Sequence, residues 1–350
     1  MTMMRAAVVA EHGDIDVIRL RSSQVPEPSV HEVRIRVSAC ALNRADLSLL
    51  AGLSGPGIRP KRLPVIPGVD IAGIIDAAGD QAERDGWKIG ESVVVYPGVF
   101  CGKCRYCRQG EETMCELYQI IGEEVDGGLA EYVIVPARNL KRMPPGFSPT
   151  LAAAAPATFT TAWRMLINRG RLEPGHKVLI VGVGAGVSTA AAAIALRFGA
   201  QVYGTTSSAS KAQRALELGL KDVQVGYKRP FDEWIMNVTQ GHGVDIVVDS
   251  VGAATWRQSI RSLAPGGRLA VCGASSGDQP EISIREIYQS HRQIVGAPCG
   301  NGREFDRVMD LVFDGMLEPI IDSVYQLDEV REAFRRLQAQ EHFGKVVVVP

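Results

Sequence analysis

The 350-residue sequence has almost no net charge, because 38 Lys and Arg residues stand against 39 Asp and Glu residues. Such a chain has no overall field that would draw it to nucleic acid or to an anionic membrane, so we expect neither as a partner. The stretch 178–196 has no charged residue, but glycines at 182, 184 and 186 interrupt it. This pattern favours a strand, a tight turn and a helix over a membrane span.

An export signal of the usual kind is also missing. The apolar run at the start is broken by Glu11, which makes it too short for a secretory signal, so we interpret it as a first strand and expect a cytoplasmic protein. Disulfides are unexpected in that compartment, and four of the seven cysteines fall within fifteen residues, which favours a metal site. Hydrophobic and charged contents of 46% and 22% are those of a folded soluble chain.

The length favours two compact units, and the residue pattern changes near Pro156. Before that point, short β-branched segments separated by Pro and Gly predict strands in a twisted, partly closed barrel, at 5–10, 17–19, 32–41 and 92–96. After it, strands at 176–182, 201–205, 222–225, 244–249, 268–273 and 293–296 alternate with helical segments such as 188–198 and 211–218. This alternation predicts a doubly wound parallel sheet.

The last apolar segment, Lys345–Val349, needs a sheet to join, and the N-terminal barrel is the expected partner. The predicted fold is therefore α/β, with a discontinuous first domain of residues 1–156 and 298–350. A dinucleotide-binding domain of residues 157–297 is inserted into it.

A glycine-rich turn at 182–187 follows the first strand of the inserted domain. Gly182, Gly184, Ala185 and Gly186 stand where the backbone can approach a pyrophosphate whose charge lies at a helix N-terminus. Val187 occupies the place of the third glycine in the usual G-x-G-x-x-G pattern, so the strand–turn–helix context carries the prediction.

The end of the next strand indicates which dinucleotide binds. Proteins that bind NAD keep an acidic residue there for the ribose 2′-hydroxyl, but here no acid appears until Glu217. Ser207 and Lys211 can instead meet a 2′-phosphate, whereas Arg214 fits a solvated helix face better. We therefore predict NADP(H).

The most specific pattern is the cysteine cluster in a lobe at about 97–116. Cys101, Cys104, Cys107 and Cys115 can close a tetrahedral shell around Zn²⁺ with no open position, which predicts one structural zinc. Positive charges interleaved with these cysteines would offset the surplus negative charge of four thiolates, at Lys103, Arg105 and Arg108. The isolated cysteines, Cys40, Cys272 and Cys299, are expected to be small core residues.

Five motifs together resemble the medium-chain dehydrogenase/reductase superfamily of zinc alcohol dehydrogenases and quinone oxidoreductases. They are the cysteine lobe and the segments 41–47, 67–73, 127–132 and 247–252. The resemblance implies a GroES-like β-barrel catalytic domain, a Rossmann domain, an active site in the cleft between them, and a homodimer or homotetramer. It also implies cofactor contacts at Thr161 near the nicotinamide, at Tyr227 beside the adenosine phosphate, and at strand ends carrying Asp249, Val251, Gly252 and Gly273.

The catalytic zinc ligands of this superfamily have no counterpart here. The corresponding positions are Asn43, Val69 and Ala157, which do not bind zinc well. One alternative is that Cys40, Asp46 and Asp70 regroup around a second metal. Asn43 instead resembles the quinone oxidoreductase branch, which uses NADPH without catalytic zinc.

Two side chains are candidates for the chemistry. Asn43 could donate a hydrogen bond to the substrate oxygen or to the nicotinamide carboxamide, or simply bond local backbone in a turn. Tyr96 could supply a proton, or pack as a strand-end aromatic on Pro97, with solvent as the proton source.

The sequence thus predicts an NADPH-dependent reductase of small quinones or α,β-unsaturated carbonyls with one structural zinc. Three other functions stay open: an alcohol dehydrogenase with an atypical metal site, an enoyl-CoA-type reductase, and a non-catalytic NADPH-binding protein. For the second, the basic loop Arg59-Pro60-Lys61-Arg62 could hold a substrate phosphate, although such a cluster is usually a solvated loop.

Overall fold

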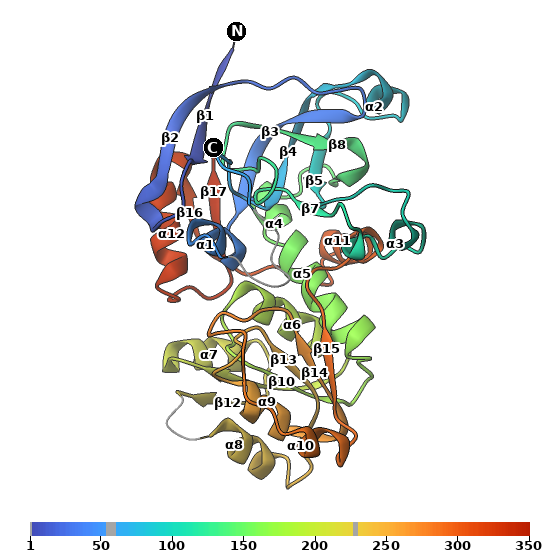
Figure 1. Ribbon diagram of the computed structural model, residues 1–350, viewed down its shortest axis with the longest axis vertical. Helices are drawn as coiled ribbons and strands as arrows, with labels where there is room; N and C mark the ends of the chain where they lie inside the picture. Colours follow the sequence, from blue (N-terminus) through green and yellow to red (C-terminus); the bar gives the residue numbers. More distant parts are fainter. Residues whose placement is uncertain (1, 54–60, 227–229) are drawn as a thin grey trace. The chain divides into compact units, whose positions relative to one another are not determined.

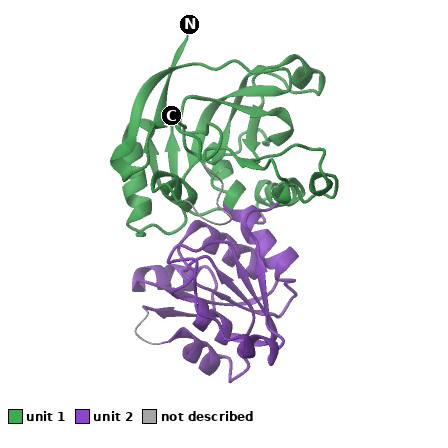
Figure 2. Ribbon diagram, in the orientation of Figure 1, with its two compact units in different colours: residues 1–157, 301–315, 319–350 green, residues 158–300, 316–318 purple. Residues whose placement is uncertain are grey.

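The computed structural model describes residues 2–53, 61–226 and 230–350 (Figure 1). The chain divides into two compact units (Figure 2). The first comprises Met1–Ala157, Asn301–Gly315 and Pro319–Pro350, and the second comprises Thr158–Gly300 and Met316–Glu318. These limits lie one to three residues from the boundaries predicted at 156/157 and 297/298, apart from the short segment Met316–Glu318.

The first unit is built on a seven-stranded sheet. Its strand order is β16-β17-β3-β4-β5-β9, and β8 also pairs with β3. The strands are β3 (Glu32–Ala41), β4 (Asp70–Ala78), β5 (Ser92–Val95), β8 (Tyr132–Pro136), β9 (Leu140–Arg142), β16 (Ile321–Gln326) and β17 (Lys345–Val349). Two short two-stranded sheets accompany it, formed by β1 (Met3–Val9) with β2 (Ile18–Gln24) and by β6 (Gly98–Val99) with β7 (Gln119–Ile120).

Strand β3 organises this unit because partners pair along both of its edges. Its alternating pattern buries Val33, Ile35 and Val37, as expected for a strand with one face on a core. The C-terminal strand β17 pairs antiparallel with the end of β3, with Val347 opposite Ala41 and Val348 opposite Cys40. The first unit therefore draws its sheet from both ends of the chain, as the sequence predicts.

Short helices surround the sheet. They are α1 (Arg44–Leu50), α2 (Asp80–Arg84), α3 (Arg105–Arg108), α4 (Pro149–Ala153), α11 (Gly302–Phe313) and α12 (Val330–Gln338), with 3₁₀ turns η1 (Ile15–Val17), η2 (Glu112–Met114), η3 (Ala137–Asn139) and η5 (Leu327–Glu329).

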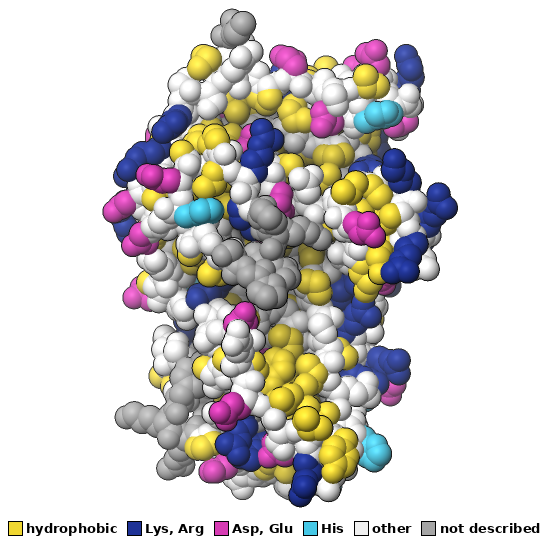
Figure 3. All heavy atoms as spheres, viewed as in Figure 1, with side chains coloured by type: hydrophobic (Ala, Val, Ile, Leu, Met, Phe, Trp, Pro, Cys, Tyr) yellow, Lys and Arg dark blue, Asp and Glu magenta, His cyan; other side chains and the backbone are white. Residues whose placement is uncertain are grey.

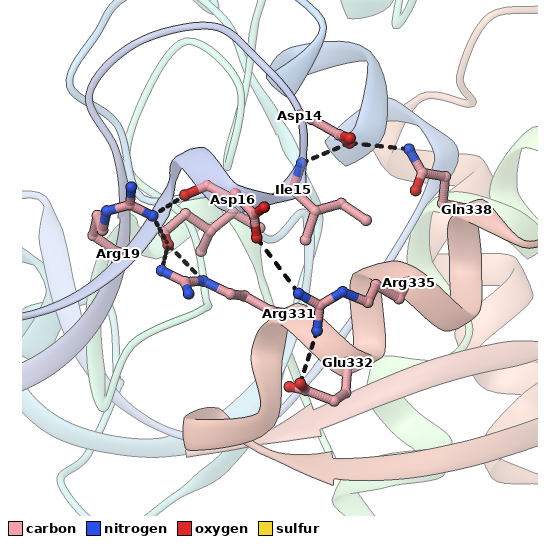
Figure 4. A network of polar contacts seen from close by, with 9 residues as sticks. Asp14, Ile15, Asp16, Arg19, Arg331, Glu332, Arg335 and Gln338 are labelled. Carbon is pink, nitrogen blue, oxygen red and sulfur yellow. Dashed lines mark hydrogen bonds and ion pairs between the residues drawn. The ribbon is translucent and has the colours of Figure 1, made fainter.

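Polar contacts join α12 to the N-terminal hairpin (Figure 4). The guanidinium of Arg331 donates two hydrogen bonds to the carbonyl of Ile18, at 3.0 and 2.7 Å. Arg335 pairs with Asp16 and Glu332, and the Gln338 amide donates to Asp14. Such exposed ion pairs individually contribute little to stability, so the network mainly fixes how α12 is aligned along the hairpin.

The second unit is a six-stranded parallel sheet in the order β12-β11-β10-β13-β14-β15. The strands are β10 (Lys177–Ile180), β11 (Gln201–Thr206), β12 (Asp222–Val225), β13 (Val244–Asp249), β14 (Leu263–Val271) and β15 (Gln293–Gly296). In chain order this is the 3-2-1-4-5-6 arrangement of a Rossmann sheet, which confirms the predicted fold class.

Helices connect these strands: α6 (Gly186–Arg197), α7 (Ala209–Glu217), α8 (Phe231–Val238), α9 (Trp256–Arg261) and α10 (Ile284–Tyr288). Before β10 come α5 (Pro156–Trp163), which begins in the first unit, and a π-helical turn, η4 (Arg164–Arg169). The uncharged stretch 178–196 forms β10, the glycine turn and most of α6. None of the helices in the described part of the chain is long and apolar enough to span a bilayer.

Candidate functional site

The four predicted metal ligands lie together in the lobe. The sulfurs of Cys101, Cys104, Cys107 and Cys115 are all within 4.8 Å of one another, and they form the metal-competent group found among the described residues. Cys107 Sγ lies 3.8 Å from Cys101 Sγ and 3.5 Å from Cys104 Sγ. A tetrahedral zinc with bonds of about 2.3 Å places its sulfurs about 3.8 Å apart, so these positions fit zinc.

Two backbone amides favour the thiolate form of Cys101. The amides of Lys103 and Cys104 donate to Cys101 Sγ at 3.5 and 3.3 Å. These hydrogen bonds lower the pKa of the Cys101 thiol to about 6, which favours the thiolate that a metal requires. The cation predicted at Arg105 is partly engaged elsewhere, since its guanidinium donates to the Tyr106 hydroxyl at 2.6 Å and stacks on that ring.

The lobe is tied to helix α11 of the same unit. Asn301 Nδ2 donates to the Gly110 carbonyl at 2.6 Å, and the Gly302 amide donates to Glu112 Oε1 at 2.7 Å. Glu112 thereby satisfies a free amide at the start of α11. The lobe is thus held by segments almost two hundred residues away.

In the second unit, the predicted glycine turn lies between β10 and α6. Gly182 and Gly184 have φ values of 76° and 133°, which residues with a Cβ rarely adopt. Ala185 is the N-cap of α6 and is exposed, while Gly186 and Val187 are half-buried in its first turn. The first amides of this helix have no intrahelical partner, so the turn can present them to a pyrophosphate.

The adjacent strand β11 ends at Thr206, where the sequence predicts contacts to the ribose. Ser207 follows and is exposed, and Ser208 caps α7 by accepting the Lys211 amide at 3.4 Å. Lys211 is half-buried in the first turn of α7. Tyr227, predicted beside the adenosine phosphate, lies outside the described residues.

The carboxylate of Asp249 is held by hydrogen bonds within the second unit. The side chain is fully buried and accepts hydrogen bonds from the amides of Val251 and Gly252 and from the hydroxyls of Thr255 (2.8 Å) and Ser259 (2.6 Å). These hydrogen bonds shape the turn after β13, and the cofactor contact at Asp249 stays a prediction. The direction of this side chain depends on Thr255 and Ser259, in the segment that begins α9, and the sequence did not reveal these contacts.

The turn that Asp249 shapes lies beside the glycine turn. A Cβ on Gly182 would lie 3.6 Å from a methyl of Val251, so the two predicted contact positions are neighbours. Gly252 has φ of 96°, and a Cβ there would lie 2.6 Å from the Gly277 carbonyl. Gly273 follows β14, where a Cβ would approach the Ser250 carbonyl to 2.9 Å. Thr161 is buried on α5, with its hydroxyl 3.4 Å from the Pro298 carbonyl.

In the first unit, Asn43 belongs to a buried charged group that the sequence did not predict. Lys345 Nζ donates to Asn43 Oδ1 at 2.7 Å and to Asp70 Oδ2 at 2.9 Å, and Asn43 Nδ2 donates to Asp70 Oδ2 at 2.8 Å. The amide of Ala157, at the start of α5, donates to Asp70 Oδ1 at 2.7 Å. We call Asn43, Asp70 and Lys345 the polar triad.

The triad is almost sealed from solvent. Asp70 is 0% exposed and Lys345 3%, whereas Asn43 is half-buried. Asn43 and the Ala157 amide, at two of the three positions that the resemblance matches to catalytic zinc ligands, therefore both donate to one carboxylate. That carboxylate is neutralised by an ammonium ion of the chain itself.

The other two residues considered for a second metal are Cys40 and Asp46, and both side chains are buried within the protein. Asp46 Oδ2 accepts the Asn43 amide at 2.7 Å and Oδ1 accepts the Gly68 amide at 3.0 Å. Burial raises the pKa of Asp46 to about 7 and raises that of the Cys40 thiol well above its usual value. In the part of the chain that the structure describes, Cys40, Asp46 and Asp70 do not form a metal-competent group as the lobe cysteines do.

Tyr96 lies in an aromatic cluster. It is 3% exposed, its hydroxyl is 3.3 Å from that of Tyr118, and its ring contacts those of Phe305 and Phe100. The packing alternative fits this environment better than the proton-donor alternative.

Lys61 in the basic loop is not the solvated side chain that the composition of the loop indicates. Lys61 forms ion pairs with Glu123 and with Glu124, the latter at 2.6 Å, and all three side chains are largely buried. Lys61 is thus engaged within the protein. Arg62 is exposed, and Arg59 and Pro60 lie outside the described residues.

Known families match both parts of the chain. Residues 29–145 match the alcohol dehydrogenase GroES-like domain, and residues 186–314 match the zinc-binding dehydrogenase domain. A zinc-type alcohol dehydrogenase-like protein of Schizosaccharomyces pombe is 32% identical over 99% of both chains. This chain belongs to the medium-chain dehydrogenase/reductase superfamily.

Relatives within the superfamily carry different names. An acryloyl-coenzyme A reductase of Sulfurisphaera tokodaii is 29% identical over 99% of this chain and 100% of its own, and the human quinone oxidoreductase is 28% identical over 96% and 94%. The crystal structure of an NAD-dependent alcohol dehydrogenase is 36% identical and covers 99% of this chain and 100% of its own, with a TM-score of 0.93. This medium-chain dehydrogenase/reductase is therefore an oxidoreductase of a family that uses a nicotinamide cofactor.

Proposed function

We propose that this medium-chain dehydrogenase/reductase reduces quinones or α,β-unsaturated carbonyls with NADPH and without a catalytic zinc. The observation that carries this proposal is the polar triad. Where zinc alcohol dehydrogenases have three ligands and an open position, this chain has a carboxamide, two aliphatic side chains and a carboxylate already paired with Lys345.

The proposed acceptors need less electrophilic help than an aldehyde. A bound reduced nicotinamide would supply a hydride to the β-carbon of the enone, the double-bond electrons would move toward the carbonyl oxygen, and solvent would protonate the resulting enolate. Asn43 stabilises the developing charge on that oxygen by donating a hydrogen bond, as an oxyanion-hole amide does. The amides at the start of α6 bind the pyrophosphate.

The preference for NADPH rests on the end of β11. Ser207 and Lys211 lie in the first turn beyond this strand, and no acid stands there to bond a 2′-hydroxyl. A 2′-phosphate would meet a hydroxyl and a cation. Lys211→Ala should therefore weaken NADPH binding more than NADH binding.

A panel of acceptors tests the proposal. Oxidation of NADPH would be followed with benzoquinone, a small enone, acryloyl-CoA and an aldehyde, each against NADH. The proposal predicts turnover of the quinone or the enone with NADPH preferred. If NADPH binds but none of these acceptors oxidises it above background, the chain is a binding protein and the reductase proposal is wrong.

Alcohol oxidation is the second candidate, because several relatives carry that name. Zinc-dependent alcohol oxidation needs a metal site, and the residues of the polar triad do not provide one. Zinc-dependent turnover of alcohols with NADP⁺ or NAD⁺ would therefore favour this second function over the first. Preference for acryloyl-CoA over the free enone would instead indicate a CoA thioester substrate, as the name of one relative suggests.

We also propose that the chain associates through the β15 edge of the second unit. Large hydrophobic side chains are exposed on and near α10 and β15, namely Ile282 (45%), Ile284 (74%), Tyr288 (60%) and Ile294 (38%). Figure 3 shows hydrophobic side chains gathered over this part of the second unit, whereas charges of both signs are interspersed elsewhere on that face. An open edge beside an apolar surface is typical of a pairing site, and light scattering on Ile284→Asp would test it.

A further inference from the structure

The polar triad fixes which way the Asn43 carboxamide faces. An ammonium ion can only donate hydrogen bonds, and a carboxylate can only accept them. Because Lys345 Nζ lies 2.7 Å from one end of the amide and Asp70 Oδ2 lies 2.8 Å from the other, the oxygen must face Lys345 and the nitrogen must face Asp70. The flipped amide would set two donors against each other and two acceptors against each other.

One of the two side-chain amide hydrogens of Asn43 has only a distant acceptor. Asn43 Nδ2 carries two hydrogens, and the short bond to Asp70 takes one. The other contact of Nδ2 is to the Ala41 carbonyl at 3.4 Å, beyond the usual range for such a bond. Asn43 is the half-buried member of the triad, so it is more accessible to a small molecule than the buried Asp70 and Lys345 are.

The backbone of Asn43 is fixed as well. Its amide donates to Asp46 Oδ2 at 2.7 Å, which holds Asn43 at the start of α1. The side chain and the backbone are therefore both held by buried carboxylates, Asp70 and Asp46, while Lys345 provides the cation.

We propose that Lys345, paired with Asp70, is a positioning residue that orients the Asn43 amide so that Nδ2 donates to the carbonyl oxygen of the substrate. This inference rests on the proposed function, because it gives Asn43 its acceptor. A buried ion pair is costly to desolvate and rarely adds net stability over an apolar replacement. Its use here is orientation, since no apolar pair would hold the amide in one direction.

Kinetic coupling between the two residues tests this role. Asn43→Ala should lower kcat on the order of 100-fold, as expected for a lost oxyanion donor, with little change in KM for NADPH. Lys345→Met keeps the length of the side chain but removes the charge, and it should lower kcat about 10- to 100-fold through misorientation. The double variant should be no more than about twofold slower than Asn43→Ala alone, because a positioning residue has nothing left to position.

Three further variants sharpen the test. Lys345→Arg retains a donor and should recover part of the rate lost in Lys345→Met. Lys141→Met is the matched control, because Lys141 pairs with Asp310 at 2.8 Å in the same unit, and it should leave kcat unchanged. If Lys345→Met fails to fold, Asp70→Asn combined with Asn43→Ala gives an equivalent cycle. Losses that multiply in the double variant would overturn the proposal.

A second readout does not depend on turnover. In protein isotope-labelled at asparagine side chains, the Asn43 amide signals are those absent from Asn43→Ala. Their hydrogens should exchange with solvent at least 10-fold faster in Lys345→Met than in the native chain, and equal rates would overturn the inference. If the native chain reduces no acceptor while the exchange rates differ as expected, the proposed function fails and the orientation of the amide stands.

Discussion

The cysteine lobe and the polar triad are two polar groups of the same unit that balance charge in opposite ways. The four lobe cysteines bring sulfurs within 4.8 Å of one another and, as thiolates, need an external cation. Asp70 has its cation in the chain, since Lys345 lies 2.9 Å away. In one unit, therefore, four clustered cysteines leave room for a metal ion, while a buried carboxylate is paired with an ammonium ion of the chain itself.

Removing a lobe ligand should have the largest effect. Cys104→Ser leaves three thiolates, so bound zinc should fall from one per chain toward none. Structural zinc contributes roughly 10–16 kcal/mol in zinc-finger peptides, and even a fraction of this would lower the melting temperature clearly. Metal analysis and a thermal scan are the measurements. Cys299→Ser, which lies in the second unit, is the control and should keep its zinc; equal zinc loss in both variants would contradict the assignment.

Breaking the polar triad should lower the stability of the chain by less than the loss of zinc does, but by more than a typical single substitution. Lys345→Met leaves the Asp70 carboxylate buried without its cation, so the free energy of unfolding should fall by about 3–5 kcal/mol. Denaturant titration measures this. Arg335→Ala, which removes an exposed pair with Asp16, should cost less than about 1 kcal/mol. Zinc content should stay at one per chain in both variants, and a loss of zinc in Lys345→Met would show that the two groups are not independent.

Asp46 is a further buried carboxylate of this unit, and it accepts hydrogen bonds from the backbone amides of Asn43 and Gly68. Burial raises its pKa to about 7 from an ordinary value near 3.8. The folded chain therefore binds one more proton than the unfolded chain between these values, so the contribution of Asp46 to stability is full below about pH 4 and is lost as the pH rises to about 7. The slope is at most about 1.4 kcal/mol per pH unit.

Asp46→Asn removes this titration. The unfolding free energy of the native chain minus that of the variant should be larger at pH 5 than at pH 8, because only the native chain loses stability as Asp46 ionises. A difference that does not change with pH would contradict the raised pKa.

Local patterns in the sequence predicted one of these two groups and not the other. The lobe ligands fall within fifteen residues, so spacing alone identifies them. The strands Asp222–Val225, Val244–Asp249 and Lys345–Val349 likewise have the predicted bounds, because apolar runs between turn residues define them locally.

Contacts between distant segments explain what the sequence missed. Lys345 and Asn43 are 302 positions apart, and they meet only because β17 pairs with the end of β3. The buried direction of Asp249 depends on Thr255 and Ser259, which reach it from the segment beginning α9. Residue types alone left a second metal at Asp70 as an alternative and favoured a solvated loop at Lys61, whereas the fold gives each a buried partner of opposite charge.

The metal content that we propose for this chain is one structural zinc and no catalytic zinc. Counting zinc per chain in metal-replete protein after a chelator wash tests it most directly. We predict one zinc in the native chain and none in Cys104→Ser. Two zinc ions in the native chain, or one retained in Cys104→Ser, would contradict the account and return alcohol oxidation to the first place.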